Sequence, residues 1–233
     1  MTEKPTIRQV APILGSAAAN GEMVTVFIGP TRKRYSIYKD LICHHSEYFQ
    51  VAFNGLWQES DKGVTLEDVE IEVFNLFVHW LYTQELPKDM SLLLQAAGTD
   101  AQLASEDSEN SHWGILLLKS CIFGDRFFAP GFHRLSHNVF VDGHFPGKGE
   151  PAFSAAYKTI IWSFGNLPEG NPVLSMMVDL QCLAWNAEDD NEEEKQLLPH
   201  LPHEFLVACM LRQSVLKTLK MTDDKLKACD YYM

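Results

Sequence analysis

The spacing of apolar residues changes period along the first part of the chain. Val24, Val26 and Ile28 recur at every second position, which is typical of a strand, here with both faces partly apolar. Residues 29–31 (Gly-Pro-Thr) favour a turn, and residues 34–38 have strand character again. The pattern therefore predicts a β-hairpin.

Two short helices are expected after the hairpin. Asp40 is a candidate cap for the first and Ser46 for the second, because both side chains can accept a hydrogen bond from the first helical turn. A short strand is expected over Val64–Leu66. The second helix carries apolar residues at helical spacing, namely Phe49, Ala52, Phe53 and Leu56.

An amphipathic helix is predicted next, with Asp68 as a candidate cap and Pro87 at its end. From residue 88 to residue 111 the character changes: residues 90–98 carry little charge and residues 99–111 are acidic and polar, which predicts a long surface insertion. The amphipathic helix before Pro87 has apolar residues at i, i+3, i+4 and i+7 that are expected to face the core, namely Phe74, Phe77, Val78 and Leu81.

The second half of the chain is predicted to be helical. A further segment begins at Pro130, residues 142–151 form a loop, and the acidic run at 188–194 is expected to be a solvated loop. Apolar stretches of helical length occupy residues 113–123, 153–164, 173–185 and about 205–219.

Composition and charge limit the classes of partner. The chain has 233 residues, of which 46% are hydrophobic, enough for one sizeable core or for a domain plus a helical extension. Its formal net charge of -12 repels phosphate, so no nucleic-acid partner is expected. No apolar run is long enough to cross a bilayer, so no membrane partner is expected either.

The cysteines indicate a reducing environment. All 5 are scattered, and no C-x-x-C pair occurs. Cys43, Cys121 and Cys209 stand inside apolar runs, as reduced core thiols do. The sequence therefore predicts an intracellular protein, cytoplasmic, nuclear or both.

Histidines are the first candidates for chemistry. His133 and His137 stand four positions apart, so a helix would place them on one face, with Cys121 upstream. A metal site needs three or four converging ligands, and the sequence offers no second close pair. Packed or solvated histidines are the default interpretation, and no metal or other cofactor is expected.

No motif of enzymatic chemistry is complete. The sequence has no G-x-S-x-G, and residues 147–149 (Gly-Lys-Gly) lack the rest of a P-loop. Cys43 precedes His44, but sequence neighbours alone say little about catalytic geometry. We therefore expect no catalytic residues and no small-molecule substrate.

Four segments, taken in order and at their spacing, resemble a BTB/POZ domain: VTVFIG, YSIYKDLICHHSEYF, GLWQES and VTLEDVEIEVFNLFVHWLYT. Two later segments, IIWSFGNLPEGNPVLSMMVDLQCLAW and LPHEFL, resemble the C-terminal half of fungal BTB proteins. The chain departs from the family at Tyr38, where histidine is usual, after Pro172, where the family's arginine is missing, and in its insertion.

The resemblance implies an α+β fold, a small β-sheet flanked by a cluster of α-helices, with an all-helical C-terminal extension. It places the BTB/POZ domain at residues 23–140, including the acidic insertion at 88–111. Residues 1–22 form an N-terminal segment, and residues 141–233 form the extension. It also implies that the chain binds protein partners and does not catalyse a reaction.

The resemblance points to one partner-binding element. In BTB adaptors of cullin-type ubiquitin ligases, a hydrophobic-x-Glu element contributes to cullin contact, and Trp57 and Glu59 match it here, with Leu56 beside them. An exposed aromatic side chain would bury apolar area, and the carboxylate would set orientation. The alternative is that Trp57 covers the end of its helix and Glu59 is solvated.

A second function stays open, that of a homo-oligomerising scaffold or transcription-regulatory interaction protein without a ligase role. BTB domains commonly pair through their N-terminal region and first helices. Residues 7–14 have the spacing of a short helix that would supply a homodimer interface, and the alternatives are that they pack on their own domain or stay disordered. The sequence does not decide between adaptor and scaffold.

Overall fold

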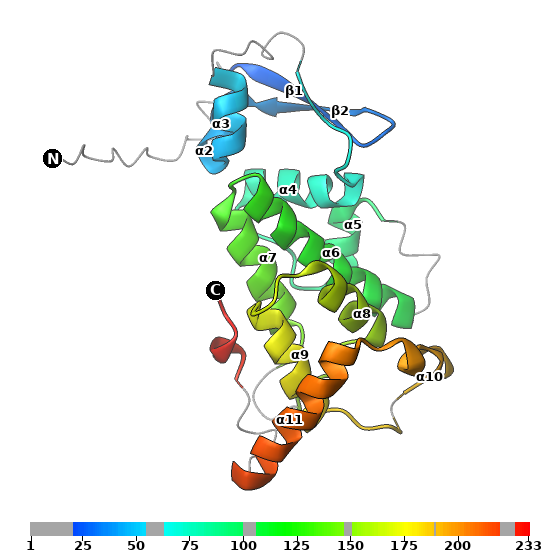
Figure 1. Ribbon diagram of the computed structural model, residues 1–233. Coiled ribbons are helices and arrows are strands. Elements are labelled where there is room, and N and C mark those ends of the chain that lie inside the picture. Colours follow the sequence, from blue (N-terminus) through cyan, green and yellow to red (C-terminus); the bar gives the residue numbers. More distant parts are fainter. Residues whose placement is uncertain (1–20, 55–62, 100–105, 147–150, 189, 220–226) are drawn as a thin grey trace, which may run out of the picture.

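The computed structural model describes residues 21–54, 63–99, 106–146, 151–188, 190–219 and 227–233. Its described part is a small sheet with a larger body of helices (Figure 1). In chain order the elements are β1 (Met23–Ile28), β2 (Lys33–Tyr38), α2 (Lys39–His45), α3 (Glu47–Asn54), β3 (Val64–Leu66), α4 (Ile71–Thr83), α5 (Met90–Ala97), α6 (Glu106–Arg126), α7 (Pro130–Asp142), α8 (Tyr157–Asn166), α9 (Pro172–Leu183), α10 (Glu192–Leu197), the 3-10 helix η2 (Leu198–His200), α11 (His203–Leu219) and the 3-10 helix η4 (Ala228–Asp230).

The sheet confirms the predicted hairpin and the third strand. Its order is β2-β1-β3, with β1 antiparallel to β2 and parallel to β3. Val26 lies opposite Val64, and both are buried. The alternation that predicted β1 therefore marks the face that packs on the helices, because successive side chains of a strand point to opposite sides.

Helix α4 lies at the centre of the core. The ring of Phe77 on this helix stacks on Phe49 of α3 and contacts Phe123 of α6 and Phe132 of α7. The ring centroids of these pairs are 4.9–6.1 Å apart. The predicted stripe of α4 is confirmed at three of its positions, and Val78 is half-buried. The buried residues of this helix are Val73, Phe74, Leu76, Phe77, Trp80 and Leu81.

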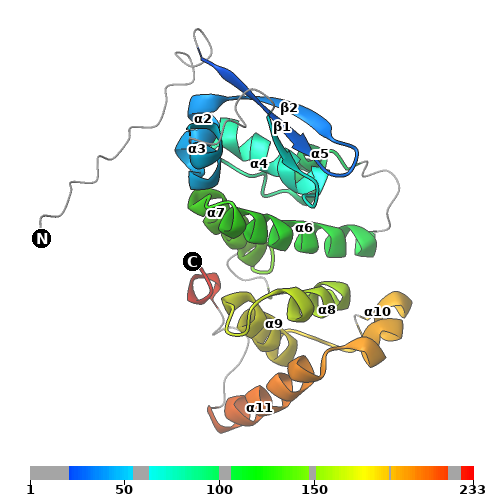
Figure 2. The same cartoon turned by 45° about the horizontal axis from the view of Figure 1, so that its top comes forward.

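The elements form successive layers, seen most clearly in Figure 2. The sheet lies over α4 and α5, which rest on α6 and α7; α8 and α9 lie beyond them, and α10 and α11 form the far end. The backbones of helices α6 and α7 are in direct contact, because a Cβ on Gly124 of α6 would lie only 2.6 Å from the backbone nitrogen of His133 on α7. None of the described helices combines the length and apolar character that crossing a bilayer requires.

The prediction of one surface insertion over residues 88–111 is wrong for the described part of that segment. Residues Met90–Ala97 form α5, whose Leu93, Leu94 and Ala97 are buried. Asp89 caps this helix by accepting a hydrogen bond from the nitrogen of Leu92 at 3.0 Å. Residues from Glu106 onward belong to α6 and not to a loop.

Two of the three predicted helix caps are wrong. Asp40 lies within the first turn of α2, and Asp68 lies before Glu70, which is the N-cap residue of α4; neither N-cap position has a side-chain cap. Ser46 is confirmed, because its Oγ accepts a hydrogen bond from the nitrogen of Phe49 at 3.3 Å. Of these three helices, only α3 is thus capped by a side chain at its N-terminus.

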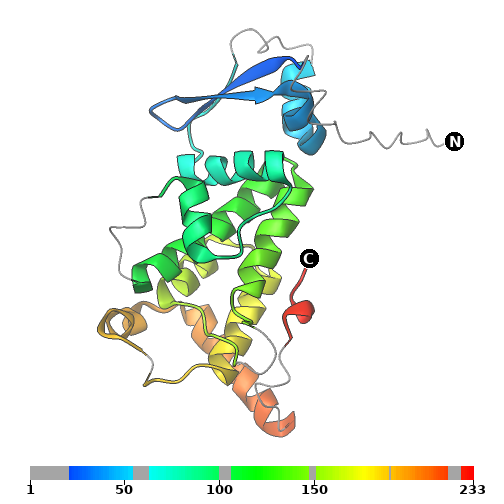
Figure 3. The same cartoon turned by 180° about the vertical axis from the view of Figure 1, so that it is seen from behind.

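The last described residues return to α7, as the view from behind shows (Figure 3). The carbonyl oxygen of Tyr231 lies 2.7 Å from Nε2 of His137, and the hydroxyl of Tyr231 donates to Asp179 of α9 at 2.8 Å. The backbone nitrogen of Met233 donates to Asn138 at 3.3 Å. These contacts fix residues 227–233 against α7 and α9.

Replacing Ser46 by alanine tests the cap and its tertiary bond together. The change removes the acceptor for the α3 N-terminus and a donor to the carbonyl of Phe127, so it should lower the free energy of unfolding by about 1–3 kcal/mol. Urea denaturation followed by circular dichroism measures this. The matched change at exposed Ser175 should stay within about 0.5 kcal/mol, and an equal loss at both sites would contradict the assignment.

Candidate functional site

The three predicted partner-binding residues, Leu56, Trp57 and Glu59, lie outside the described residues. Their role therefore stays a prediction. They follow directly in the chain after α3, whose last residue is Asn54. The surface of α3 and the segments packed against it are the described part of this candidate site.

A buried serine joins the start of α3 to the turn between α6 and α7. The Oγ of Ser46 donates to the carbonyl oxygen of Phe127 at 2.6 Å, and the backbone nitrogen of Glu47 donates to that of Phe128 at 3.2 Å. Ser46 is only 1% exposed, so water does not compete for its bond. The α2–α3 corner and the α6–α7 turn consequently form one rigid unit.

Two large apolar side chains stand out from this unit. Phe128 is 60% exposed and Val51 of α3 is 68% exposed. Phe128 also has a φ of 49°, a left-handed conformation that costs a non-glycine residue about 1–2 kcal/mol. An exposed aromatic ring on a strained, anchored backbone is typical of a binding position, and we name Val51, Phe128 and the hollow beside them the α3 face.

The hollow of the α3 face has a volume of about 280 Å³. Its wall comes from α2, α3 and the start of α7, and it includes His44, Gln50 and Pro130 beside the ring of Phe128. A shallow polar hollow next to an exposed ring can accept a polar side chain of a partner while the ring is buried. The sequence pattern did not single out Phe128, because its exposure depends on contacts made far away in the chain.

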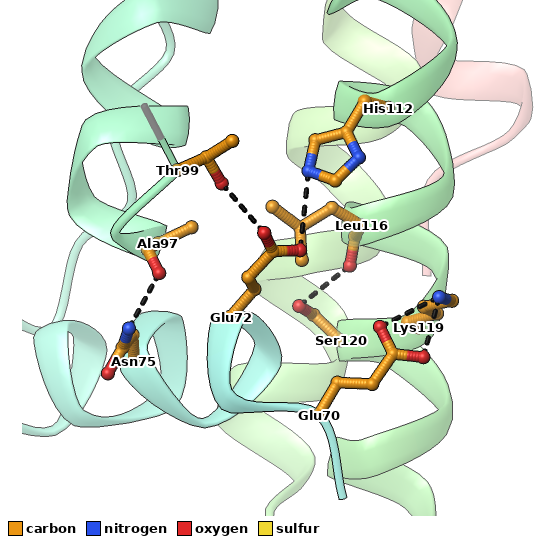
Figure 4. Close-up of polar contacts among 9 residues, drawn as sticks. All are labelled: Glu70, Glu72, Asn75, Ala97, Thr99, His112, Leu116, Lys119 and Ser120. Carbon is orange, nitrogen blue, oxygen red and sulfur yellow. Dashed lines mark hydrogen bonds and ion pairs between the residues drawn. The ribbon is translucent and has the colours of Figure 1, made fainter. Parts of the chain in front are cut away.

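Polar side chains of α4 connect it to its neighbours, as the close-up in Figure 4 shows. Glu72 accepts a hydrogen bond from Thr99 at 3.1 Å, and its other oxygen lies 3.3 Å from Nε2 of His112 on α6. Asn75 donates to the carbonyl of Ala97 at 2.6 Å and accepts from the hydroxyl of Tyr35 on β2 at 2.6 Å. These bonds fix α4 to the sheet, α5 and α6.

A groove of about 410 Å³ lies where α4, α6 and α8 meet. Two ion pairs line it: Lys119 with Glu70 at 2.6 Å, drawn in Figure 4, and Arg126 with Asp68 at 2.5 Å. The hydrogen bond from Arg126 lowers the pKa of Asp68. Ile122 of α6 is 37% exposed in this groove, which is a second described hollow with an exposed apolar side chain.

The predicted histidine pair is packed against backbone carbonyls. Nδ1 of His133 lies 2.8 Å from the carbonyl oxygen of Cys121, and Nε2 of His137 lies 2.7 Å from that of Tyr231. Burial raises the pKa of the Cys121 thiol, which disfavours the thiolate that binds metals. Within the described ranges, no group of three or more His, Cys, Asp or Glu side chains could hold a metal ion.

His44 and His45, at the end of α2, touch each other edge to face with ring centroids 4.7 Å apart. His45 also packs on Trp80 at 5.1 Å, and its Nε2 lies 3.2 Å from the side-chain nitrogen of Gln84. Burial, with a smaller effect of His44, lowers the pKa of His45 to about 4. This side chain is therefore neutral at physiological pH and acts as a packing group behind the α3 face.

The acidic run at 188–194 is not simply a solvated loop. Asp190 accepts hydrogen bonds from the hydroxyl of Tyr157 and from Nε1 of Trp185, both at 2.9 Å, and Glu194 accepts from the nitrogen of Tyr157 at 3.0 Å. These residues line a cavity of about 660 Å³ that also contacts Trp113. The carboxylates act here as acceptors that hold the start of α8, a role that depends on residues more than 30 positions away in sequence.

A small mixed sheet covered by helices defines an α+β domain, and its α2–α3 corner exposes apolar side chains. Residues 14–99 match the family model of the BTB/POZ domain. Residues 14–99 of this chain therefore carry a BTB/POZ domain, a type of protein–protein interaction module, which confirms the predicted BTB/POZ domain and the α+β fold class; the fungal origin stays a prediction. Helices α6 to α11 lie beyond the matched residues, and the domain limits at 22/23 and 140/141 stay predictions.

The polar ties of α4 should differ in their contribution to stability. Asn75→Ala removes a half-buried amide, leaves the Tyr35 hydroxyl and the Ala97 carbonyl without this partner, and should lower the free energy of unfolding by about 1–3 kcal/mol. Lys119→Ala breaks a surface ion pair and should cost at most about 1 kcal/mol. Chemical denaturation of the two variants measures both values, and a larger loss for Lys119→Ala would contradict this order.

The neutral state of native His45 predicts a pH dependence. Because its pKa falls from 6.5 to about 4 on folding, the unfolded chain binds a proton that the folded chain does not as pH drops through this window. Stability should therefore decline between pH 6.5 and 4, and His45→Gln should make the decline shallower. Denaturation at several pH values measures the slope; Gln50→Ala changes no titratable group and should leave it unaltered.

Proposed function

We propose that this protein is a non-catalytic adaptor whose α3 face, together with Leu56, Trp57 and Glu59, binds a cullin-type scaffold of a ubiquitin ligase. The observation that carries the proposal is Phe128, an exposed ring on an anchored turn beside α3. A rigid aromatic anchor loses little conformational entropy on binding, so most of its buried area contributes to affinity.

The order of the chain supports this assignment. The hydrophobic-x-Glu element follows α3 within five residues, and α3 itself contributes exposed Val51 to the α3 face. A partner that covers Val51 would lie on the helix that the segment carrying Trp57 and Glu59 follows directly in sequence. One carboxylate next to apolar anchors would set the orientation of a partner with a complementary cation.

A double variant, Trp57→Ala with Glu59→Ala, tests the proposal, and Phe128→Gly tests the described part of the same surface. Glycine adopts the positive φ of residue 128 without strain, so this change removes the ring and keeps the fold. Each variant should lower the affinity for the N-terminal domain of the bound cullin by roughly tenfold or more. Co-purification and titration calorimetry across a panel of cullin N-terminal domains measure the effect.

The matched control is Met210→Ser, which removes an exposed apolar side chain from α11 at the far end of the molecule. It should bind the cullin as the parent protein does, and all variants should keep the parent melting temperature. If no cullin binds the parent protein and light scattering gives a dimer that the Phe128 change leaves intact, the homo-oligomerising scaffold replaces the adaptor.

A further inference from the structure

A second groove lies at the end of the molecule farthest from the sheet. It has a volume of about 610 Å³, within the ~300–1,000 Å³ of typical binding pockets. Helix α11 forms one wall, and α9 with the end of α8 forms the other, as Figures 1 and 2 allow the reader to follow. Its apolar lining, which we name the α11 groove, consists of Phe164, Leu174, Val178, Ala208, Leu211 and Val215.

Helix α11 carries more apolar surface than its own contacts use. Phe205 and Leu216 face the core and are 1% and 6% exposed. Leu211 and Val215, on the groove side, are 61% and 46% exposed. A helix that is apolar on several sides is normally buried on several sides, so the groove side of α11 has the composition of a covered surface.

The groove is preformed. Phe164 contacts Phe205 edge to face with centroids 5.4 Å apart, which fixes α11 to α8. Asp179 of α9 accepts hydrogen bonds from Arg212, at 3.2 Å from Nη2, and from the hydroxyl of Tyr231 at 2.8 Å. A ligand therefore meets a fixed wall and avoids the entropy of ordering one.

The charge at the groove is acidic. Arg212 and Asp179 neutralise each other, whereas Glu169 and Glu204 on the rim form none of the ion pairs found among the described residues. Both glutamates are exposed. Their charge attracts a basic partner and disfavours a second copy of this chain, whose net charge is -12.

We propose that the α11 groove binds an amphipathic helix of a partner protein, with apolar side chains on one face and lysine or arginine beside them. The apolar floor accepts side chains at i, i+3 or i+4 and i+7, as helix-in-groove recognition requires. Glu169 and Glu204 pair with the basic residues at the edge. This site is separate from the α3 face and does not depend on cullin binding.

Selection from a display library of 16-residue helical peptides on the full chain tests the proposal directly. Enriched peptides should share the apolar spacing and carry a net positive charge. One enriched peptide, labelled with fluorescein, then serves as the probe for fluorescence polarisation. Enrichment of neutral or acidic peptides, or of none, would overturn the proposal.

Three variants locate the bound peptide. Leu211→Ser, in the groove, should weaken binding by roughly tenfold, whereas Met210→Ser, on the same helix but outside the groove lining, should bind as the parent does. The double change Glu169→Lys with Glu204→Lys should weaken binding by roughly fivefold at low salt and less at high salt. Equal affinity of the Leu211 and Met210 variants would contradict this location.

The same measurements separate this site from the proposed adaptor function. Phe128→Gly should leave the peptide affinity unchanged even where it abolishes cullin binding. Light scattering of the parent and Leu211→Ser proteins tests the alternative that a second copy of this chain fills the groove. A dimer that Leu211→Ser dissociates would show this and would overturn the proposal.

Discussion

The burial of α4 is the interaction on which the other elements depend. Phe77 touches aromatic rings from α3, α6 and α7, so a single side chain joins three helices that are distant in the sequence. A fully buried phenylalanine contributes on the order of 2–3 kcal/mol, and its removal leaves a cavity that costs more. The sheet needs the same helix, because a small sheet of short strands is at best marginally stable alone in water.

The polar side of α4 directs how the layers meet. Asn75 donates a hydrogen bond to the carbonyl of Ala97 at the end of α5 and accepts one from a hydroxyl of β2. Glu72 accepts a hydrogen bond from Thr99 and lies within ion-pair distance of His112 on α6. Apolar contacts alone permit several rotations of one helix on another. Directional bonds at both edges of the buried stripe select one of them, and thereby set where the α6–α7 turn presents Phe128.

Local patterns predicted what local forces determine. The strands and the stripe of α4 follow from the periods of two and 3.6 residues, and the cap at Ser46 follows from its neighbours. The sequence does not predict helix α5, because consecutive leucines hide its period, and it predicts a solvated Asp190, because the partner Tyr157 lies 33 positions away. Phe128 was missed for the same reason, since Ser46 anchors its turn across 81 positions. Leu56, Trp57 and Glu59 rest on the family resemblance alone.

The α3 face and the α11 groove lie at opposite ends of a continuous core, and this geometry bears on how the two proposed sites would work together. Helix α6 lies in the layer between them and is packed on α4, α7 and α8 (Figure 2). A close-packed core of this kind resists deformation, so a ligand at one end changes the other end little. Two partners would then bind independently and would be held at a fixed separation. For an adaptor, a fixed separation is the useful property, because the effective concentration of one bound partner near the other depends on distance and stiffness.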